Sequence, residues 1–266
     1  MEKSYHIGFK DACGAKYAIL PGDPGRVETI AKELDNPRFF YQNREYTTWI
    51  GNIENEPVLV MSTGMGGAST AIGVEELKVL GLETLIRIGT CGGMHINVEA
   101  GDVVIATGAI RQDGTSKEYV PVEFPALADL TVTNALVEGF KQAQKIKHQE
   151  TTQEQNAKLH TGIVHCKDSF YGQHSPERMP VGYELKEKWQ AWIKAGCLAS
   201  EMESATLYIV SQILEIKAGC VLSVVWNQER ENMGLSNKPV KDPILAVKTA
   251  VEAIRVMITG GKTSCC

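Results

Sequence analysis

Apolar runs that end in glycine-rich turns recur through the first half of the chain. The first run, residues 17–20, breaks at Pro21-Gly22, and residues 27–34 are then spaced like a helix that begins just after Arg26. Further apolar runs cover residues 57–70, 84–93 and 102–110, and three of the four glycine turns directly follow a predicted strand. In a parallel sheet, such turns place backbone N–H groups at one edge, where they can approach an anion.

Other segments carry helical or alternating patterns. Residues 38–53 alternate aromatic and polar side chains, which is typical of a hairpin. The polar, glutamine-rich residues 145–160 predict an exposed loop or a helix extension. The remaining patterns predict helices over residues 70–80, 131–145, 184–195, 202–214 and 243–257, and strands over residues 162–167 and 220–227. Alternating strands and helices predict an α/β fold with a largely parallel sheet, and no linker divides residues 1–266, so we expect a single domain.

Composition narrows the class of protein. With 266 residues and 43% hydrophobic content, the chain can bury a sizeable core. It has no apolar run of about 18 residues, and its first residues lack the apolar segment of a signal peptide, so we expect no membrane partner and a cytoplasmic location. The formal net charge of −5 and the lack of a long basic run argue against a nucleic-acid partner. A bound anion would therefore be small and held by a few arginines.

The cysteines do not suggest a metal site or a disulfide framework. They number seven, an odd set without C-x-x-C spacing, and we expect reduced thiols: Cys13, Cys91, Cys166, Cys197, Cys220, Cys265 and Cys266. The terminal pair does not form a prenylation signal. Cys91 lies on a turn, as nucleophiles often do, but it has no adjacent histidine that could act as a base, and His95 is expected to be a loop residue. We therefore expect Cys91 to be a half-buried thiol without a catalytic role.

Arg87 is an energetic anomaly within an apolar run. It lies between Ile86 and Ile88, where an unpaired guanidinium would cost several kcal/mol, on the order-of-magnitude scale for buried ions. Its partner must be either a buried carboxylate or a bound anion.

The neighbouring strand ends favour an anion. They carry Gly22, Arg26, Ser69, Thr90 and the turns at residues 64–67 and 92–93. Arginines, hydroxyls and accessible backbone amides are the groups that bind phosphate or sulfate. The turn GMGGAS lacks the third glycine of G-x-G-x-x-G, and the chain has no G-x-x-x-x-G-K-[ST], so a dinucleotide or ATP site is weakly supported.

Two further groups of polar residues lie in the second half. Glu201 and Glu203 begin an apolar helix; the helix dipole accounts for one carboxylate and leaves the other free to accept hydrogen bonds from sugar hydroxyls. The loop DSFYGQHSPER offers Phe170 for stacking and Gln173 and Arg178 as donors to a heterocyclic base. Taken alone, this segment is only a polar loop with an aromatic residue.

Six ordered motifs together resemble one family. PGDPGR, NREYTTW, STGMGGAST, RIGTCGG, DSFYGQ and SEMES are similar to those of hexameric nucleoside phosphorylases, and the resemblance runs from about His6 to the last predicted helix. It implies a single α/β domain with a mixed, partly barrel-like sheet flanked by helices. It also implies a homohexamer, a trimer of dimers whose active sites are shared between subunits.

The resemblance implies a role for each matching residue. Phosphate would be bound by Gly22, Arg26, Arg87 and Thr90, with Arg44 from the neighbouring subunit. The ribose would be held by Met202 and Glu203, with His6 of the neighbour on its 5′-hydroxyl and Thr90 close by. Uracil would stack on Phe170 and bind Gln173 and Arg178. Some family members bind a monovalent cation at the dimer interface, which implies potassium at Glu45, Met65 and Ser69.

The activity implied is the reversible phosphorolysis of uridine to uracil and ribose 1-phosphate, with inorganic phosphate as co-substrate and no required cofactor. Three departures from the family pattern stand out. Gln173 and Arg178 are five residues apart rather than two, and Ser200 replaces a bulkier tyrosine. Near Trp226-Asn227 the chain lacks the Ser-Asp pair of purine-specific relatives, which favours a pyrimidine. The alternatives are a purine nucleoside phosphorylase, a hydrolase of the same fold, and a non-catalytic nucleoside-binding protein.

Overall fold

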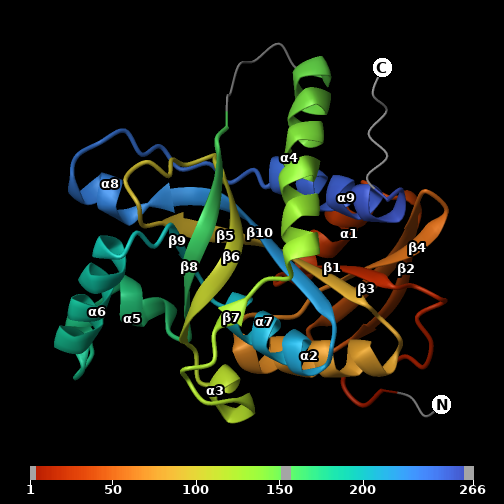
Figure 1. Ribbon diagram of the computed structural model, residues 1–266, viewed down its shortest axis with the longest axis horizontal. Helices are drawn as coiled ribbons and strands as arrows, with labels where there is room; N and C mark the ends of the chain where they lie inside the picture. The colour runs from red at the N-terminus through yellow and green to blue at the C-terminus, as the bar shows by residue number, and fades with distance from the viewer. Residues whose placement is uncertain (1–3, 151–156, 261–266) are drawn as a thin grey trace.

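Strands of the protein form one mixed sheet in a computed structural model that describes residues 4–150 and 157–260 (Figure 1). The strands are β1 (Tyr17–Pro21), β2 (Asp35–Asn43), β3 (Tyr46–Ile53), β4 (Glu56–Met61), β5 (Thr84–Gly93), β6 (Val103–Gln112), β7 (Ala126–Leu127), β8 (Leu159–Lys167), β9 (Ala199–Glu201) and β10 (Lys217–Asn227). The helices are α1 (Val27–Ala31), α2 (Gly67–Val79), α3 (Thr115–Tyr119), α4 (Leu130–Glu150), α5 (Phe170–His174), α6 (Gly182–Lys194), α7 (Ser204–Ile213), α8 (Gln228–Asn232) and α9 (Ile244–Ile258), with 3-10 turns η1 (Pro24–Arg26) and η2 (Pro176–Arg178).

Part of the sheet closes into a barrel. The pairing order β10-β6-β8-β9-β5 is completed by pairing between β10 and β5, which gives a ring of five strands. From β5 the sheet continues as β1-β4-β3-β2 and ends in the predicted hairpin. The α/β fold with a mixed, partly barrel-like sheet is therefore confirmed. The sheet is less parallel than the strand–helix alternation alone predicted, because β2, β3 and β4 are joined antiparallel and β10 meets β6 antiparallel.

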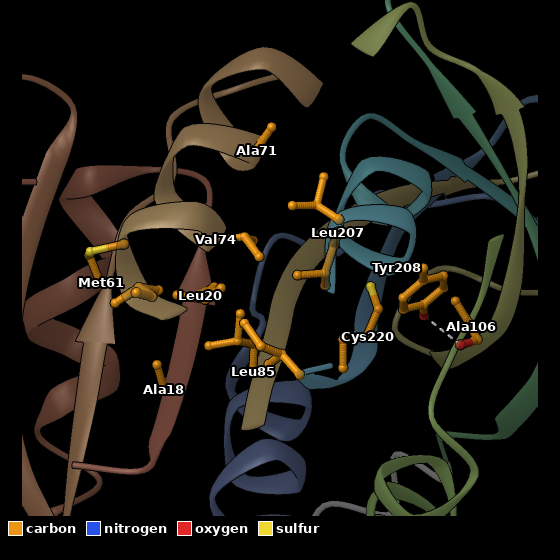
Figure 2. Packing of buried hydrophobic residues seen from close by; sticks show 14 of the residues in the cluster. Ala18, Leu20, Met61, Ala71, Val74, Leu85, Ala106, Leu207, Tyr208 and Cys220 are labelled. Atoms are coloured by element: carbon orange, nitrogen blue, oxygen red, sulfur yellow. Dashed lines mark hydrogen bonds between the residues drawn. The ribbon is translucent and has the colours of Figure 1, made fainter. Parts of the chain in front are cut away.

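Helices cover both faces of the central strands, and the side chains of β5 divide between them. Leu85 packs with residues of α2 and α7, among them Val74 and Leu207 (Figure 2). Ile86 and Ile88 belong to the second cluster, which includes residues of α4 and α9 on the opposite face (Figure 1). Because side chains alternate along a strand, Arg87 shares the face of Leu85 and lies on the α7 side of the sheet.

The observed ends of several helices and strands differ from the predicted ones. α1 ends at Ala31 rather than at residue 34, because β2 begins at Asp35. α4 continues to Glu150, which is one of the two alternatives predicted for residues 145–160, and residues 151–156 lie outside the described part of the chain. β8 begins at Leu159, so the end of that segment is a strand and the strand predicted from residue 162 starts earlier. The predicted helix over residues 202–214 begins only at Ser204, because β9 occupies the preceding residues. The short elements β7, β9, α3 and α8 were not predicted, and the loop at residues 168–178 contains α5 and η2.

Two findings concern composition. In the ranges that the structure describes, no helix is long and apolar enough to cross a membrane. Cys13, Cys91, Cys166, Cys197 and Cys220 are free thiols, while Cys265 and Cys266 lie outside the described residues.

Candidate active site

Arg87 lies at the centre of a buried charge cluster. Its Nε atom is 3.1 Å from Glu201 Oε2, and its Nη2 atom donates to Glu203 Oε2. Burial opposes the charge of Arg87, but the two carboxylates outweigh it and hold the pKa above its ordinary value. Within the described residues, the third nitrogen, Nη1, is buried and has no hydrogen-bond partner. The two explanations of this arginine thus apply to different atoms: carboxylates pair with Nε and Nη2, and Nη1 is left for a ligand.

Glycines allow the chain to pack closely around this guanidinium. A Cβ on Gly22 would lie 3.0 Å from the carbonyl oxygen of Gly64 and 3.8 Å from Arg87 Nη1. A Cβ on Gly89, two residues along the strand, would lie 2.8 Å from Arg87 Nη2. The first two glycine turns therefore meet beside the unpaired nitrogen, as expected for an anion site built from strand ends.

Glu201 and Glu203 have different structural roles. Glu201 accepts hydrogen bonds from the backbone N–H groups of Glu203 (2.9 Å) and Ser204 (3.0 Å), and so caps the start of α7. Glu203 accepts one from the backbone N–H of Gly66 at 2.6 Å, which ties α7 to the second glycine turn. Glu201 thus serves the helix terminus, as predicted for one of the two carboxylates, and the role of Glu203 toward a ligand stays a prediction.

The ionisation of the two carboxylates also differs. Burial would raise the pKa of Glu201, but Arg87 and the hydrogen bonds at the helix start outweigh it and lower the pKa. Burial raises the pKa of Glu203; Arg87 opposes this effect and the neighbouring charge of Glu201 adds to it. Glu203 is therefore the less strongly stabilised anion, and a hydrogen-bond donor from a ligand would favour its charged form.

The other predicted phosphate residues occupy separate turns and strand ends. Arg26 ends η1, with its Nε atom 3.7 Å from Asp23 Oδ2, and Thr90 is half-buried three positions after Arg87 on β5. Arg44 is exposed in the β2–β3 turn with a φ of 53°. Cys91 is buried, burial raises the pKa of its thiol, and its Sγ atom lies 3.7 Å from the carbonyl oxygen of Ser223. A protonated thiol supports a bystander role for Cys91.

The N-terminal segment and the predicted cation residues lie near α2. His6 Nδ1 is 2.7 Å from Glu76 Oε1, and the backbone N–H of His6 donates to the same carboxylate, so this side chain is held against α2. Ser69 donates to Glu45 Oε1 at 2.7 Å, and this bond lowers the pKa of Glu45 against the effect of partial burial. Met65 is exposed and lies in the turn between β4 and α2.

The predicted base-binding residues separate in the structure. A cavity of about 490 Å³ lies beside α5 and α6, and Gln173 lines it, whereas Phe170 and Arg178 are not among its lining residues. Phe170 is 51% exposed and its ring centre is 4.3 Å from that of His174. The Arg178 guanidinium lies 5.5 Å from the ring centre of Tyr171. Gln173 is therefore the one of these three that reaches the cavity wall.

A polar network in the cavity was missed by the sequence analysis. Ser200 Oγ accepts from Lys167 Nζ at 2.9 Å and donates to Gln173 Oε1 at 2.8 Å. It also lies 3.1 Å from His165 Nδ1, and His165 Nε2 lies 2.5 Å from Gln112 Oε1. His165 and Lys167 alternate along the end of β8, so they share a face. The available signal was the alternation of two polar residues in a buried strand, whereas Arg87 was marked by a single charge between two isoleucines.

His165 should make stability depend on pH. Burial, with a smaller contribution from the charge of Lys167, lowers the pKa of His165 to about 3. In the unfolded chain the pKa of a histidine is near 6.5, so below this pH the unfolded chain binds a proton that the folded chain does not. The free energy of unfolding therefore falls as the pH falls, by about 1.4 kcal/mol per pH unit down to the folded pKa. When the pH is lowered from 7 to 5, the free energy of unfolding of His165→Gln should therefore fall by about 2 kcal/mol less than that of the parent, as measured by urea denaturation. Parallel pH dependence in the two proteins would contradict this assignment.

Fold and site together define an α/β protein with a buried arginine–glutamate cluster, glycine turns suited to an anion, and an adjoining polar cavity. The sequence model of the phosphorylase superfamily matches residues 16–256, and the chain belongs to this family. The family resemblance predicted from the motifs is confirmed.

Individual relatives cover nearly the whole chain. A uridine phosphorylase from Treponema pallidum (strain Nichols) is 51% identical over 255 residues, which cover 96% of this chain and 94% of the relative. A uridine phosphorylase from Escherichia coli (strain K12) is 38% identical over 265 residues, covering 97% of this chain and 100% of the relative. A guanosine phosphorylase from Halorubrum lacusprofundi is 33% identical over 258 residues, covering 97% and 98%.

Proposed function

We propose that this protein catalyses the reversible phosphorolysis of uridine to uracil and ribose 1-phosphate. The observation that carries the proposal is the buried Nη1 atom of Arg87, unpartnered within the described chain and adjacent to Gly22. A buried donor without an acceptor is costly, and a phosphate oxygen at this position would satisfy it with a charge-assisted hydrogen bond. The names of the relatives from Treponema and Escherichia support uridine as the nucleoside.

Phosphate would be both nucleophile and electrostatic partner. Arg87, Arg26 and Gly22 would bind it, together with Thr90 and with Arg44 of a neighbouring copy. One phosphate oxygen forms a bond to C1′ of the ribose as the C1′–N1 bond breaks, and the bonding electron pair leaves with uracil. The sugar gains oxocarbenium character in the transition state, which the adjacent phosphate charge stabilises.

The nucleoside would occupy the space between the charge cluster and the cavity. Glu203 would accept hydrogen bonds from the 2′- and 3′-hydroxyls, Met202 would pack against the ribose, and His6 of a neighbouring copy would contact the 5′-hydroxyl. Phe170 would stack on the base. Gln173, with Arg178 from the rim, would bind the polar edge of uracil. A stabilised uracil anion leaves without a general acid, and it takes its proton from solvent afterwards.

We also propose assembly as a homohexamer, a trimer of dimers, since the roles of His6 and Arg44 require a second subunit. Potassium would bind at the interface through Glu45, Met65 and Ser69. The ionised Glu45 and the adjacent Ser69 hydroxyl fit the cation, because oxygen ligands suit hard cations. The cation would fix the position of this turn beside the phosphate site.

An absorbance assay of base release tests the proposal. Uridine should be cleaved only when phosphate is present, and inosine much more slowly. Faster cleavage of inosine or guanosine would favour a purine phosphorylase, for which the Halorubrum relative is the precedent. Release of uracil without phosphate would indicate a hydrolase, and no release from any nucleoside would indicate a binding protein.

A further inference from the structure

Lys167 is a buried lysine without a counter-ion among the residues that the structure describes. It is the last residue of β8, it is 6% exposed, and it lines the cavity. Among the described residues it forms no ion pair, and its ammonium has one hydrogen-bond acceptor, Ser200 Oγ at 2.9 Å. An ammonium carries three donors, so two of them have no acceptor in this part of the chain.

Such a charge is costly to keep for structural reasons. Burial lowers the pKa of Lys167, and the charges of Glu201 and Glu203 oppose this effect from a distance longer than an ion pair. Arg87, the other buried cation of the site, has two carboxylate partners. An unpaired buried charge costs free energy, so an apolar residue at this position should not destabilise the fold. Its unused donors therefore point to a ligand.

The position of Lys167 indicates which part of the ligand it meets. Ser200 Oγ bridges Lys167 Nζ and Gln173 Oε1, so the ammonium and the Gln173 amide belong to one hydrogen-bonded chain on the cavity wall. Arg178, the cation expected at the base, is exposed and lies over Tyr171. Lys167 is therefore the buried cation beside the residue assigned to the base.

We propose that Lys167 is a catalytic residue whose ammonium donates to a carbonyl oxygen of the pyrimidine and stabilises the base anion as the C1′–N1 bond breaks. The proposal rests on the proposed phosphorolysis and deepens it. The donor also sets specificity: the carbonyl oxygens of uracil accept from an ammonium, whereas the amino group of cytosine is itself a donor. If the cytosine amino group occupies the position of the uracil carbonyl that Lys167 binds, cytidine should be cleaved much more slowly than uridine.

Lys167→Met tests this role, because methionine keeps the length of the side chain and removes the charge. Lys194→Met is the matched control, since Lys194 is an exposed lysine at the end of α6 that does not line the cavity. We expect Lys167→Met to lower kcat for uridine by about 10- to 100-fold, the range for a hydrogen bond to a charged group. The loss should be several-fold smaller for 5-fluorouridine, whose base anion is already stabilised by fluorine. Lys194→Met should behave like the parent with both substrates.

The outcomes separate a catalytic role from a structural one. Near-parental kcat in Lys167→Met, or an equal loss with uridine and 5-fluorouridine, would overturn the proposal. The melting temperature of this variant should equal or exceed that of the parent; if it does not fold, Lys167→Gln provides a second neutral side chain for the same comparison. Failure of the parent to release uracil in a phosphate-dependent manner would instead overturn the proposed function, whatever the variants do.

Discussion

Replacing Arg87 with alanine is expected to nearly abolish phosphorolysis of uridine, because it removes the buried donor assigned to phosphate. Loss of one preorganised donor of this kind typically lowers the rate by about 10²–10³. The same change leaves Glu201 and Glu203 without their cation, and breaking a buried ion pair costs about 3–5 kcal/mol of stability. Activity and unfolding must therefore be measured on the same preparations.

Arg87→Lys separates the two effects. Lysine keeps a positive charge for the glutamates but loses the planar fork that leaves Nη1 directed at Gly22. We expect its kcat/KM for uridine to remain about 10²-fold below the parent even at saturating phosphate, with most of the stability restored. Arg255→Lys is the matched control, because Arg255 also pairs with two glutamates, Glu54 and Glu252, and lies on α9. Near-normal turnover in Arg87→Lys would refute the phosphate assignment.

Glu203→Gln is expected to lower kcat/KM for uridine by about 10²-fold or more. Two charge-assisted hydrogen bonds to ribose hydroxyls, each worth about 1.5–3 kcal/mol, are weakened together. The neutral amide also pairs less well with Arg87 and with the backbone N–H of Gly66. Comparing kcat/KM for uridine and 2′-deoxyuridine measures how much of this loss comes from the 2′-hydroxyl of the ribose.

The loss in Glu203→Gln should be clearly smaller for 2′-deoxyuridine, because one of the hydroxyls that Glu203 binds is already missing. Glu252→Gln is the control, a glutamate buried on α9 that also pairs with an arginine, and it should leave both substrates unaffected. Equal losses with the two nucleosides would assign Glu203 to the support of Arg87 alone.

The sequence was sufficient to single out Arg87 but not its partners. A permanent charge between Ile86 and Ile88 demands an anion wherever the strand is buried. Glu201 and Glu203, however, lie 114 and 116 residues further along the chain, and the pairing of β9 with β5 brings this segment to Arg87. The local sequence pattern predicts that Arg87 has an anionic partner, but the tertiary fold determines how many of its guanidinium nitrogens are paired with carboxylates.

For Lys167 and Arg178, the sequence could not predict which side chain is buried. A lysine at the end of a strand is usually solvated, and Lys167 is buried because α5, α6 and β9 enclose its end of the sheet. Arg178 follows Pro176, which begins the 3-10 turn η2, and the turn leaves its guanidinium over Tyr171. The sequence suggested Arg178 and not Lys167, because the packing around the loop determines which of the two cations faces the cavity.

Short elements were missed for a related reason. β9 has three residues and β7 has two, too few for any periodicity to register. Capping residues offered a better signal for two of the short helices: Ser169 accepts a hydrogen bond from the backbone N–H of Gly172, and Asn227 accepts from those of Glu229 and Arg230.

The most direct test of the central claim is the product balance of the reaction with uridine and inorganic phosphate. Phosphorus NMR of the mixture should show ribose 1-phosphate formed in equal amount to the uracil released, with no cleavage when phosphate is omitted. Free ribose in place of the sugar phosphate, or uracil release that does not depend on phosphate, would contradict the assignment of Arg87 and its glycine turns to a phosphate nucleophile.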